Sequence, residues 1–205
     1  MISYYLEIVI LSLIQGISEF IPISSSAHLI LISKISNFKI ASLEIDVSMH
    51  LGSLLAILFY FRKDLLGIFK NKNLLKLIVF GSLPLIVVGL IFYQTGFINY
   101  LRDIRIIAWT TLLFGILLFI ADKFKNNKNI NNDLTMKNIL LIGIFQILSL
   151  IPGVSRSGIT ITAGRFFNFS RLDSSKISFY LSIPALMGAS ALTLKDIFEK
   201  TFEIN

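Results

Sequence analysis

The chain has 205 residues, of which 55% are hydrophobic, and its mean hydropathy of +0.79 excludes an ordinary soluble globular domain. It contains no cysteine, which excludes disulfides, thiol chemistry and cysteine-based zinc sites. The net charge of +7 comes largely from lysines and arginines in short loops between apolar runs. This distribution favours a polytopic membrane protein and argues against nucleic-acid binding.

The first element, residues 6–33, is apolar at both ends but carries "SEFIPISSSAH" (18–28) in its middle. Polar groups inside a bilayer are costly unless they are partnered, so they usually mark a function. Pro22 breaks the first helix, and Ser24 or Ser25 can cap a second helix that returns. We therefore expect a re-entrant helical hairpin here.

Apolar runs of near bilayer length follow, and we expect spans at about Val47–Phe61, Leu74–Tyr93, Ile106–Ala121 and, near the end, Ile177–Leu194. The loops at 62–73 and 122–133 are rich in basic residues, whereas the loop at 94–105 has only Arg102 and Arg105. The positive-inside rule therefore predicts that the first two loops are cytoplasmic and that 94–105 lies outside.

A second polar segment, residues 138–169, repeats the pattern of the first. "LIQGISEFIPISSSAH" (13–28) and "IFQILSLIPGVSRSGI" (144–159) share a Gln, a Pro and a Ser-x-Ser at an offset of about 130 residues. Because an odd number of spans separates the two hairpins, the second copy must be inverted. The sequence thus predicts an all-α polytopic membrane protein with inverted-topology repeats, whose two re-entrant hairpins meet near the midplane across a cavity.

We expect a single membrane domain over residues 1–205, with repeat 1 at about 1–122 and an incomplete repeat 2 at about 135–205. The second copy has two spans fewer than the first. A homodimer or a partner subunit is therefore expected to close the cavity.

The second turn, "PGVSRSGITIT" (152–162), has the composition of a phosphate site. Its Pro-Gly pair breaks the chain, and Ser157 is expected to cap a half-helix that begins at Gly158. A helix start binds anions, and Arg156 adds a planar, fork-shaped cation. Hydroxyl donors surround it at Ser155, Ser157 and Thr160. Arg165 is expected to lie outside the site, where lysine should replace it at little cost.

The first turn offers a nucleophile and a base. His28 lies on the same helical face as Ser24 and Ser25, and a hydroxyl beside an imidazole is a minimal activated nucleophile. Alternatively, His28 activates water or protonates a leaving group. Glu19 either orients His28, binds a hard cation, or pairs with Arg156. Together the two turns suit phosphoryl transfer on a phosphate that arrives on a lipid.

The segments "QGISEFIPISSSAHL" (15–29) and "PGVSRSGITI" (152–161) resemble the two signature segments of the bacterial undecaprenyl-diphosphatase (bacitracin-resistance) family, and "HLGSLLAILFYFRKDL" (50–65) resembles its next block. The resemblance implies a multi-pass enzyme of the bacterial inner membrane. Such an enzyme hydrolyses undecaprenyl diphosphate to undecaprenyl phosphate and inorganic phosphate, recycling the lipid carrier of cell-wall synthesis.

The resemblance also implies roles for single residues. It assigns catalysis or substrate binding to Glu19, Ser25, His28 and Arg156, and phosphate contacts to Ser24, Ser155, Ser157 and Thr160. It implies a divalent cation, Mg²⁺ or Ca²⁺, with Glu19 and Gln15 as ligands. Many relatives carry Glu at position 15, and a Gln amide is a weaker, uncharged ligand. The main alternative is a lipid-phosphate transporter or flippase without hydrolysis, because inverted repeats are typical of alternating access.

Overall fold

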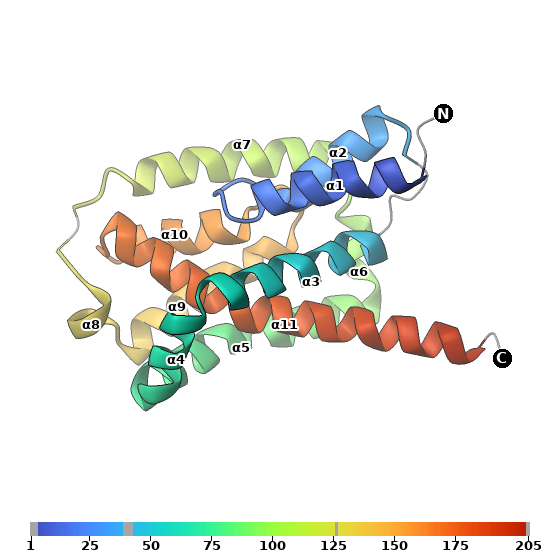
Figure 1. The fold of residues 1–205 in the computed structure, drawn as a ribbon. Helices are drawn as coiled ribbons and strands as arrows, with labels where there is room; N and C mark the ends of the chain where they lie inside the picture. The colour runs from blue at the N-terminus through green and yellow to red at the C-terminus, as the bar shows by residue number, and fades with distance from the viewer. Residues whose placement is uncertain (1–3, 39–42, 126, 204–205) are drawn as a thin grey trace.

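The computed structural model describes residues 4–38, 43–125 and 127–203, and over these ranges the chain is a bundle of helices without a β-strand (Figure 1). The helices are α1 (Tyr4–Ser18), α2 (Ser25–Ile35), α3 (Leu43–Tyr60), α4 (Arg62–Lys70), α5 (Lys72–Thr95), α6 (Phe97–Tyr100), α7 (Ile104–Ala121), α8 (Ile130–Asp133), α9 (Met136–Ile147), a 3₁₀ turn (Leu148–Leu150), α10 (Arg156–Phe166) and α11 (Arg171–Glu203).

The long helices lie where the apolar runs predict them. Among the described residues, α5 and α7 are long and apolar enough to cross a membrane. The last helix, α11, begins earlier than the expected span because a reciprocal cap starts it. The Ser170 hydroxyl accepts a hydrogen bond from the Asp173 amide at 3.0 Å and donates one to the Asp173 carboxylate at 2.7 Å.

The centre of the bundle depends on a close approach of α5 and α9. A Cβ atom added to Gly143 would collide with the backbone of Gly81, so only glycine fits at this crossing. Around it, buried side chains of α5, α9, α10, α11 and the turn before α11 form a core cluster of Leu77, Ile139, Ile142, Ala163, Phe169, Ile177 and Leu181. This core holds α10, and with it the second polar turn, in place.

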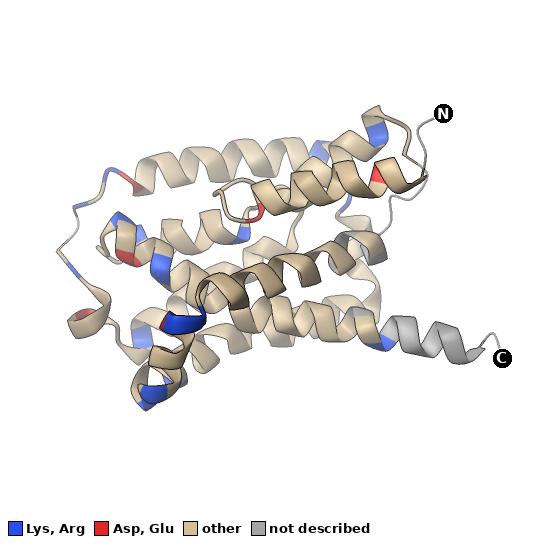
Figure 2. Ribbon diagram, in the orientation of Figure 1, with Lys and Arg blue, Asp and Glu red and all other residues tan. Residues whose placement is uncertain are grey.

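The outer surface of the bundle is apolar. On α7, Trp109 is 64% exposed and Phe119 is 65% exposed, and the residues between them are also largely apolar. Charged residues gather mostly near the ends of the helices (Figure 2). An apolar belt between charged ends fits an α-helical polytopic membrane protein.

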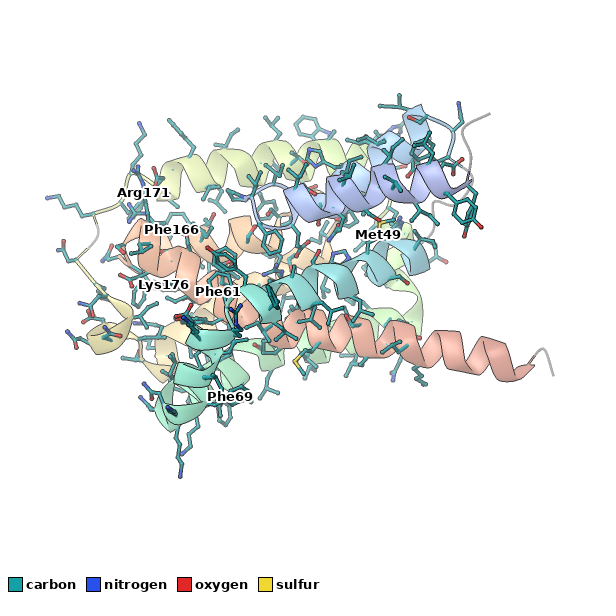
Figure 3. The ribbon with its side chains drawn as sticks, viewed as in Figure 1. Met49, Phe61, Phe69, Phe166, Arg171 and Lys176 are labelled. Atoms are coloured by element: carbon teal, nitrogen blue, oxygen red, sulfur yellow. The ribbon has the colours of Figure 1, made fainter. Side chains whose placement is uncertain are left out.

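The two ends of the bundle differ in charge as expected. The basic helix α4 and the connection from α7 to α8 lie at one end, and α6 lies at the other (Figure 1). Near the first end, Phe61, which stands between α3 and α4 and is labelled in Figure 3, packs against Phe179 of α11 with ring centroids 5.2 Å apart. The structure thus places the loops at 62–73 and 122–133 together, opposite the loop at 94–105.

Arg165 is a structural residue, and its surroundings argue against the expectation that lysine could replace it at little cost. Its side chain is only 3% exposed. The guanidinium donates to the backbone carbonyls of Phe169 at 2.8 Å, Asp122 at 2.9 Å and Phe124 at 2.8 Å. Three acceptors in different directions need a planar donor fork, which an ammonium group lacks.

Candidate active site

The first polar turn lies between α1 and α2. The backbone amide of Glu19 still bonds to the carbonyl of Gln15 at 3.0 Å, and Pro22 then prevents the helix from continuing. Ser24 caps α2, because its side chain accepts a hydrogen bond from the Ala27 amide at 3.3 Å. Ser25 therefore stands at the first position of α2, with its side chain at the turn.

The second polar turn lies between α9 and α10 and has the same local design. Gly153 has a φ of 95°, a conformation that favours glycine. Thr110 of α7 holds the turn by donating to the carbonyl of Pro152 at 2.7 Å. The cap is Ser155, which accepts from the Gly158 amide at 3.1 Å, so α10 begins at Arg156. The prediction that Ser157 caps a helix starting at Gly158 is wrong by two positions.

The two turns are in direct contact, as the sequence pattern predicts. The Gly153 amide donates to the Ser24 hydroxyl at 3.2 Å. In return, the Ser157 hydroxyl donates to the carbonyl of Ile21 at 3.1 Å. Each turn thus provides a hydrogen-bond partner for a backbone group of the other turn. Irregular backbone inside an apolar bundle needs such partners, because its polar groups are not paired within a helix.

Glu19 is the centre of the site. Its side chain is 5% exposed, and its Oε1 accepts a hydrogen bond from Arg156 Nη2 at 2.6 Å. Its Oε2 accepts from Ser25 Oγ at 2.8 Å and from Gln15 Nε2 at 3.0 Å. His50 Nε2, on α3, lies 3.5 Å from the same Oε2. Four elements therefore bring side chains to one buried carboxylate: α1, α2, α3 and α10.

A cavity of about 540 Å³ opens beside this carboxylate. Its polar end is formed by the two turns, and its long walls come from α5 and α11. The polar residues that line it are Glu19, Ser24, Ser25, Ser26, His50, Tyr93, Arg102, Ser149, Ser155, Arg156 and Ser157. The walls are apolar and include Leu85, Leu90, Leu186 and Leu192. The site can therefore hold a polar head group and an apolar chain together.

Three of the expected site residues, Gln15, His28 and Thr160, do not line this cavity. His28 Nδ1 contacts the backbone carbonyl of Ser24 at 2.7 Å, since a helical side chain leans back over the preceding turn. The hydroxyl of Ser25 is bonded to Glu19 instead, so the predicted pair of His28 and Ser25 is not formed. Thr160 is fully buried and its hydroxyl lies 2.7 Å from that of Ser178 on α11.

The side chains around Glu19 show whether this carboxylate is free to bind the expected divalent cation. Oε2 of Glu19 accepts hydrogen bonds from Ser25 and Gln15 and lies 3.5 Å from His50 Nε2, whereas Oε1 accepts one hydrogen bond, from the cationic side chain of Arg156. Gln15 turns its amide nitrogen to Glu19, while its buried Oε1 has no hydrogen-bond partner. No group of three or more His, Asp or Glu side chains suited to a metal occurs in the described part of the chain. In this arrangement the residues do not fit a cation bound to Glu19.

His50 is the site residue that sequence reasoning missed. It lies inside the block "HLGSLLAILFYFRKDL", 31 positions after Glu19, and its only signal is that an ionisable side chain stands in an apolar helix. Such a residue is a functional candidate by default. Its approach to Glu19 depends on the packing of α3 against α1, which no local pattern reveals.

Comparison with known proteins agrees with the geometry. The family model described as bacitracin resistance protein BacA matches residues 8–205. A protein of Pelagibacter ubique named undecaprenyl-diphosphatase is 58% identical over 206 residues, covering 100% of this chain and 80% of that protein. Proteins of the same name from Campylobacter curvus and Elusimicrobium minutum are 41% and 42% identical, covering 91% and 92% of this chain and 75% and 76% of their own lengths. The chain therefore belongs to the bacitracin resistance protein BacA family.

Proposed function

We propose that this chain hydrolyses undecaprenyl diphosphate to undecaprenyl phosphate and inorganic phosphate, recycling the lipid carrier of cell-wall synthesis. The relatives carry the name of this activity. The observation that carries the proposal is the contact of Ser25 and Arg156 with one buried carboxylate at the polar end of an apolar cavity. Nothing in the described residues favours transport without hydrolysis.

Arg156 and the two helix starts bind the diphosphate in this proposal. Only Nη2 of Arg156 is bonded to Glu19, and among the described residues Nε and Nη1 make no hydrogen bond. These donors can grip a phosphate oxygen while the pair with Glu19 is kept. The N-termini of α2 and α10 both lie at this point, and their partial positive charges add to the attraction. The hydroxyls of Ser24, Ser155 and Ser157 complete the phosphate contacts.

Glu19 is the general base. In one route, Ser25 Oγ attacks the terminal phosphorus and passes its proton to Glu19 Oε2, 2.8 Å away, while undecaprenyl phosphate leaves. Water then cleaves the phosphoserine and releases inorganic phosphate. In the other route, water attacks directly and gives its proton to Glu19. Arg156 stabilises the charge on the phosphoryl oxygens in both routes.

The apolar walls of α5 and α11 hold the polyprenyl chain.

The proposed membrane arrangement is an inner-membrane, multi-pass protein with two inverted repeats and two re-entrant hairpins. The matching serine caps, Ser24 on α2 and Ser155 on α10, support the repeat. The orientation of the loops stays a prediction from their charges.

Two expectations stay predictions. The family resemblance implies a divalent cation, although the side chains that contact Glu19 in this arrangement are hydrogen-bond donors rather than cation ligands. The second expectation that stays a prediction is a homodimer. No step of the proposed reaction depends on either of them.

The decisive experiment measures phosphate release from a polyprenyl diphosphate by the purified protein in detergent. Wild-type protein should release phosphate, and Ser25→Ala should release it far more slowly. Substrate labelled in the terminal phosphate, quenched in acid during turnover, separates the two routes: label on Ser25 indicates the phosphoserine, and its absence indicates direct attack by water. Wild-type protein that binds the lipid but releases no phosphate would refute the proposed function.

A further inference from the structure

We propose that His50 is a positioning residue of this site, whose Nε2–H donates to Oε2 of Glu19 and holds the carboxylate in place for Ser25. This inference rests on the proposed phosphatase activity. His50 belongs to α3, which contributes neither of the two polar turns. The distance of 3.5 Å to Glu19 Oε2 nevertheless brings its imidazole into the site.

The surroundings of His50 distinguish it from a histidine that only packs. Its side chain is 20% exposed, and it lines the cavity together with Ser25 and Arg156. Other residues of α3 face an apolar cluster: Leu54 and Ile57 are buried against Leu186 of α11. A polar ring on such a helix is costly unless polar groups surround it, and the Glu19 carboxylate is one such group within reach.

The contribution of His50 follows from how Glu19 is held. Gln15 reaches Oε2 from within α1, one turn away, and Arg156 holds Oε1 from α10. When Nε and Nη1 of Arg156 bind phosphate oxygens, Nη2 still holds Oε1, but Arg156 makes no contact with Oε2. A donor from α3 then keeps Oε2 directed at Ser25 Oγ, so the proton-accepting atom does not turn away during the reaction.

A donor role makes a specific prediction about replacements. The amide nitrogen of glutamine stands at the same number of bonds from Cβ as Nε2 of histidine, whereas that of asparagine matches Nδ1 and falls short. His50→Gln therefore keeps the hydrogen bond to Glu19, and His50→Asn and His50→Leu lose it. A purely structural role would not separate Gln from Asn in this way.

The test measures kcat and KM for phosphate release from polyprenyl diphosphate, together with the thermal unfolding temperature of each purified protein. We expect His50→Leu and His50→Asn to lose about tenfold or more in kcat, the effect of one hydrogen bond to a charged group. Their KM should change by no more than about twofold, and His50→Gln should stay within about threefold of wild type. Gly52→Ala is the matched control on α3, because a Cβ there meets nothing within 4 Å, and it should leave kcat and KM unchanged.

The outcomes separate the inference from the proposed function. Wild-type kcat in His50→Leu, or equal loss in His50→Gln and His50→Asn, would overturn the role of His50 while the phosphatase activity stands. Wild-type protein without phosphate release would overturn the proposed function and this role with it. If His50→Leu unfolds, the two polar variants, Gln and Asn, still decide the question.

Discussion

Ser25 and Arg156 occupy the same position on two different helices, the first residue after a serine cap, and both donate a hydrogen bond to Glu19. The hydroxyl reaches Oε2 and the guanidinium reaches Oε1. The two similar turns therefore carry different chemical groups at the same position. The first turn places a hydroxyl that can act as a nucleophile, and the second places a guanidinium that can bind phosphate. The carboxylate between them couples the two.

Arg156→Lys should lose most of its activity while the protein still folds. Lysine keeps the charge, but its ammonium group lacks the planar fork of donors with which arginine can bind Glu19 and a phosphate oxygen at the same time. Loss of a well-placed donor at a developing oxyanion typically costs about 3–4 kcal/mol, or roughly 100- to 1000-fold in kcat. The measurement is phosphate release from polyprenyl diphosphate. Arg105→Lys, an exposed position at the start of α7, is the matched control, and a fully active Arg156→Lys enzyme would contradict the assigned role.

Ser25→Ala and Glu19→Gln should not combine additively. If Glu19 accepts the proton of Ser25, each single variant removes the same step, and the double variant should be little slower than either one. The comparison of kcat among the four proteins forms a double-mutant cycle. Losses that multiply in the double variant would show that the two residues act in separate steps.

Gln15→Glu should strengthen cation binding next to Glu19. The substitution replaces a hydrogen bond to Glu19 with a second buried carboxylate, and two such charges in contact repel each other unless a cation binds between them. We expect the thermal unfolding temperature of Gln15→Glu to rise with added Mg²⁺ or Ca²⁺ and to fall with a chelator. The same additions should move the wild-type unfolding temperature much less. Equal shifts in both proteins would indicate cation binding elsewhere.

Arg165→Lys should destabilise the protein. Lysine can satisfy at most part of the three backbone carbonyls that Arg165 now binds, so buried acceptors are left without donors. We expect a loss of about 2 kcal/mol or more in the free energy of unfolding, measured by denaturation in detergent. Arg171→Lys, whose side chain is 76% exposed in its ion pair with Asp122, is the control and should change stability by less than about 1 kcal/mol.

The orientation predicted from loop charges can be tested with single cysteines, because the chain has none of its own. A cysteine at Phe97 should react with an impermeant reagent in intact cells, and one at Asn127 should react only after the membrane is opened. Both positions are exposed in the structure. The reverse labelling pattern would show that the loops face the opposite way.

Much of the fold could be predicted because its signals are local. Apolar runs mark the long helices, Pro22 marks the first turn, and Ser24 was one of two expected caps. The second cap was misplaced because Ser155 and Ser157 are equally good caps by composition. Their hydroxyls even lie 3.1 Å apart, and only the backbone path after Gly153 decides between them.

The site was predictable in its parts but not in its pairings. The pairing of Glu19 with Arg156 was one of three alternatives in the sequence. Helical spacing predicted that His28 lies near Ser25, but the serine hydroxyl donates its hydrogen bond to the Glu19 carboxylate, which is the stronger acceptor. The approach of His50 depends on a contact between helices, and spacing along the chain carries no information about it.

The ion pair between Glu19 and Arg156 joins residues that are 137 positions apart, and this separation has a consequence for biogenesis. A ribosome delivers the first hairpin long before the second, so Glu19 exists for a time without its cation. A buried carboxylate without a partner is unfavourable. We therefore expect α1 and α2 to reach their final packing only after α10 has been synthesised and Arg156 can pair with Glu19.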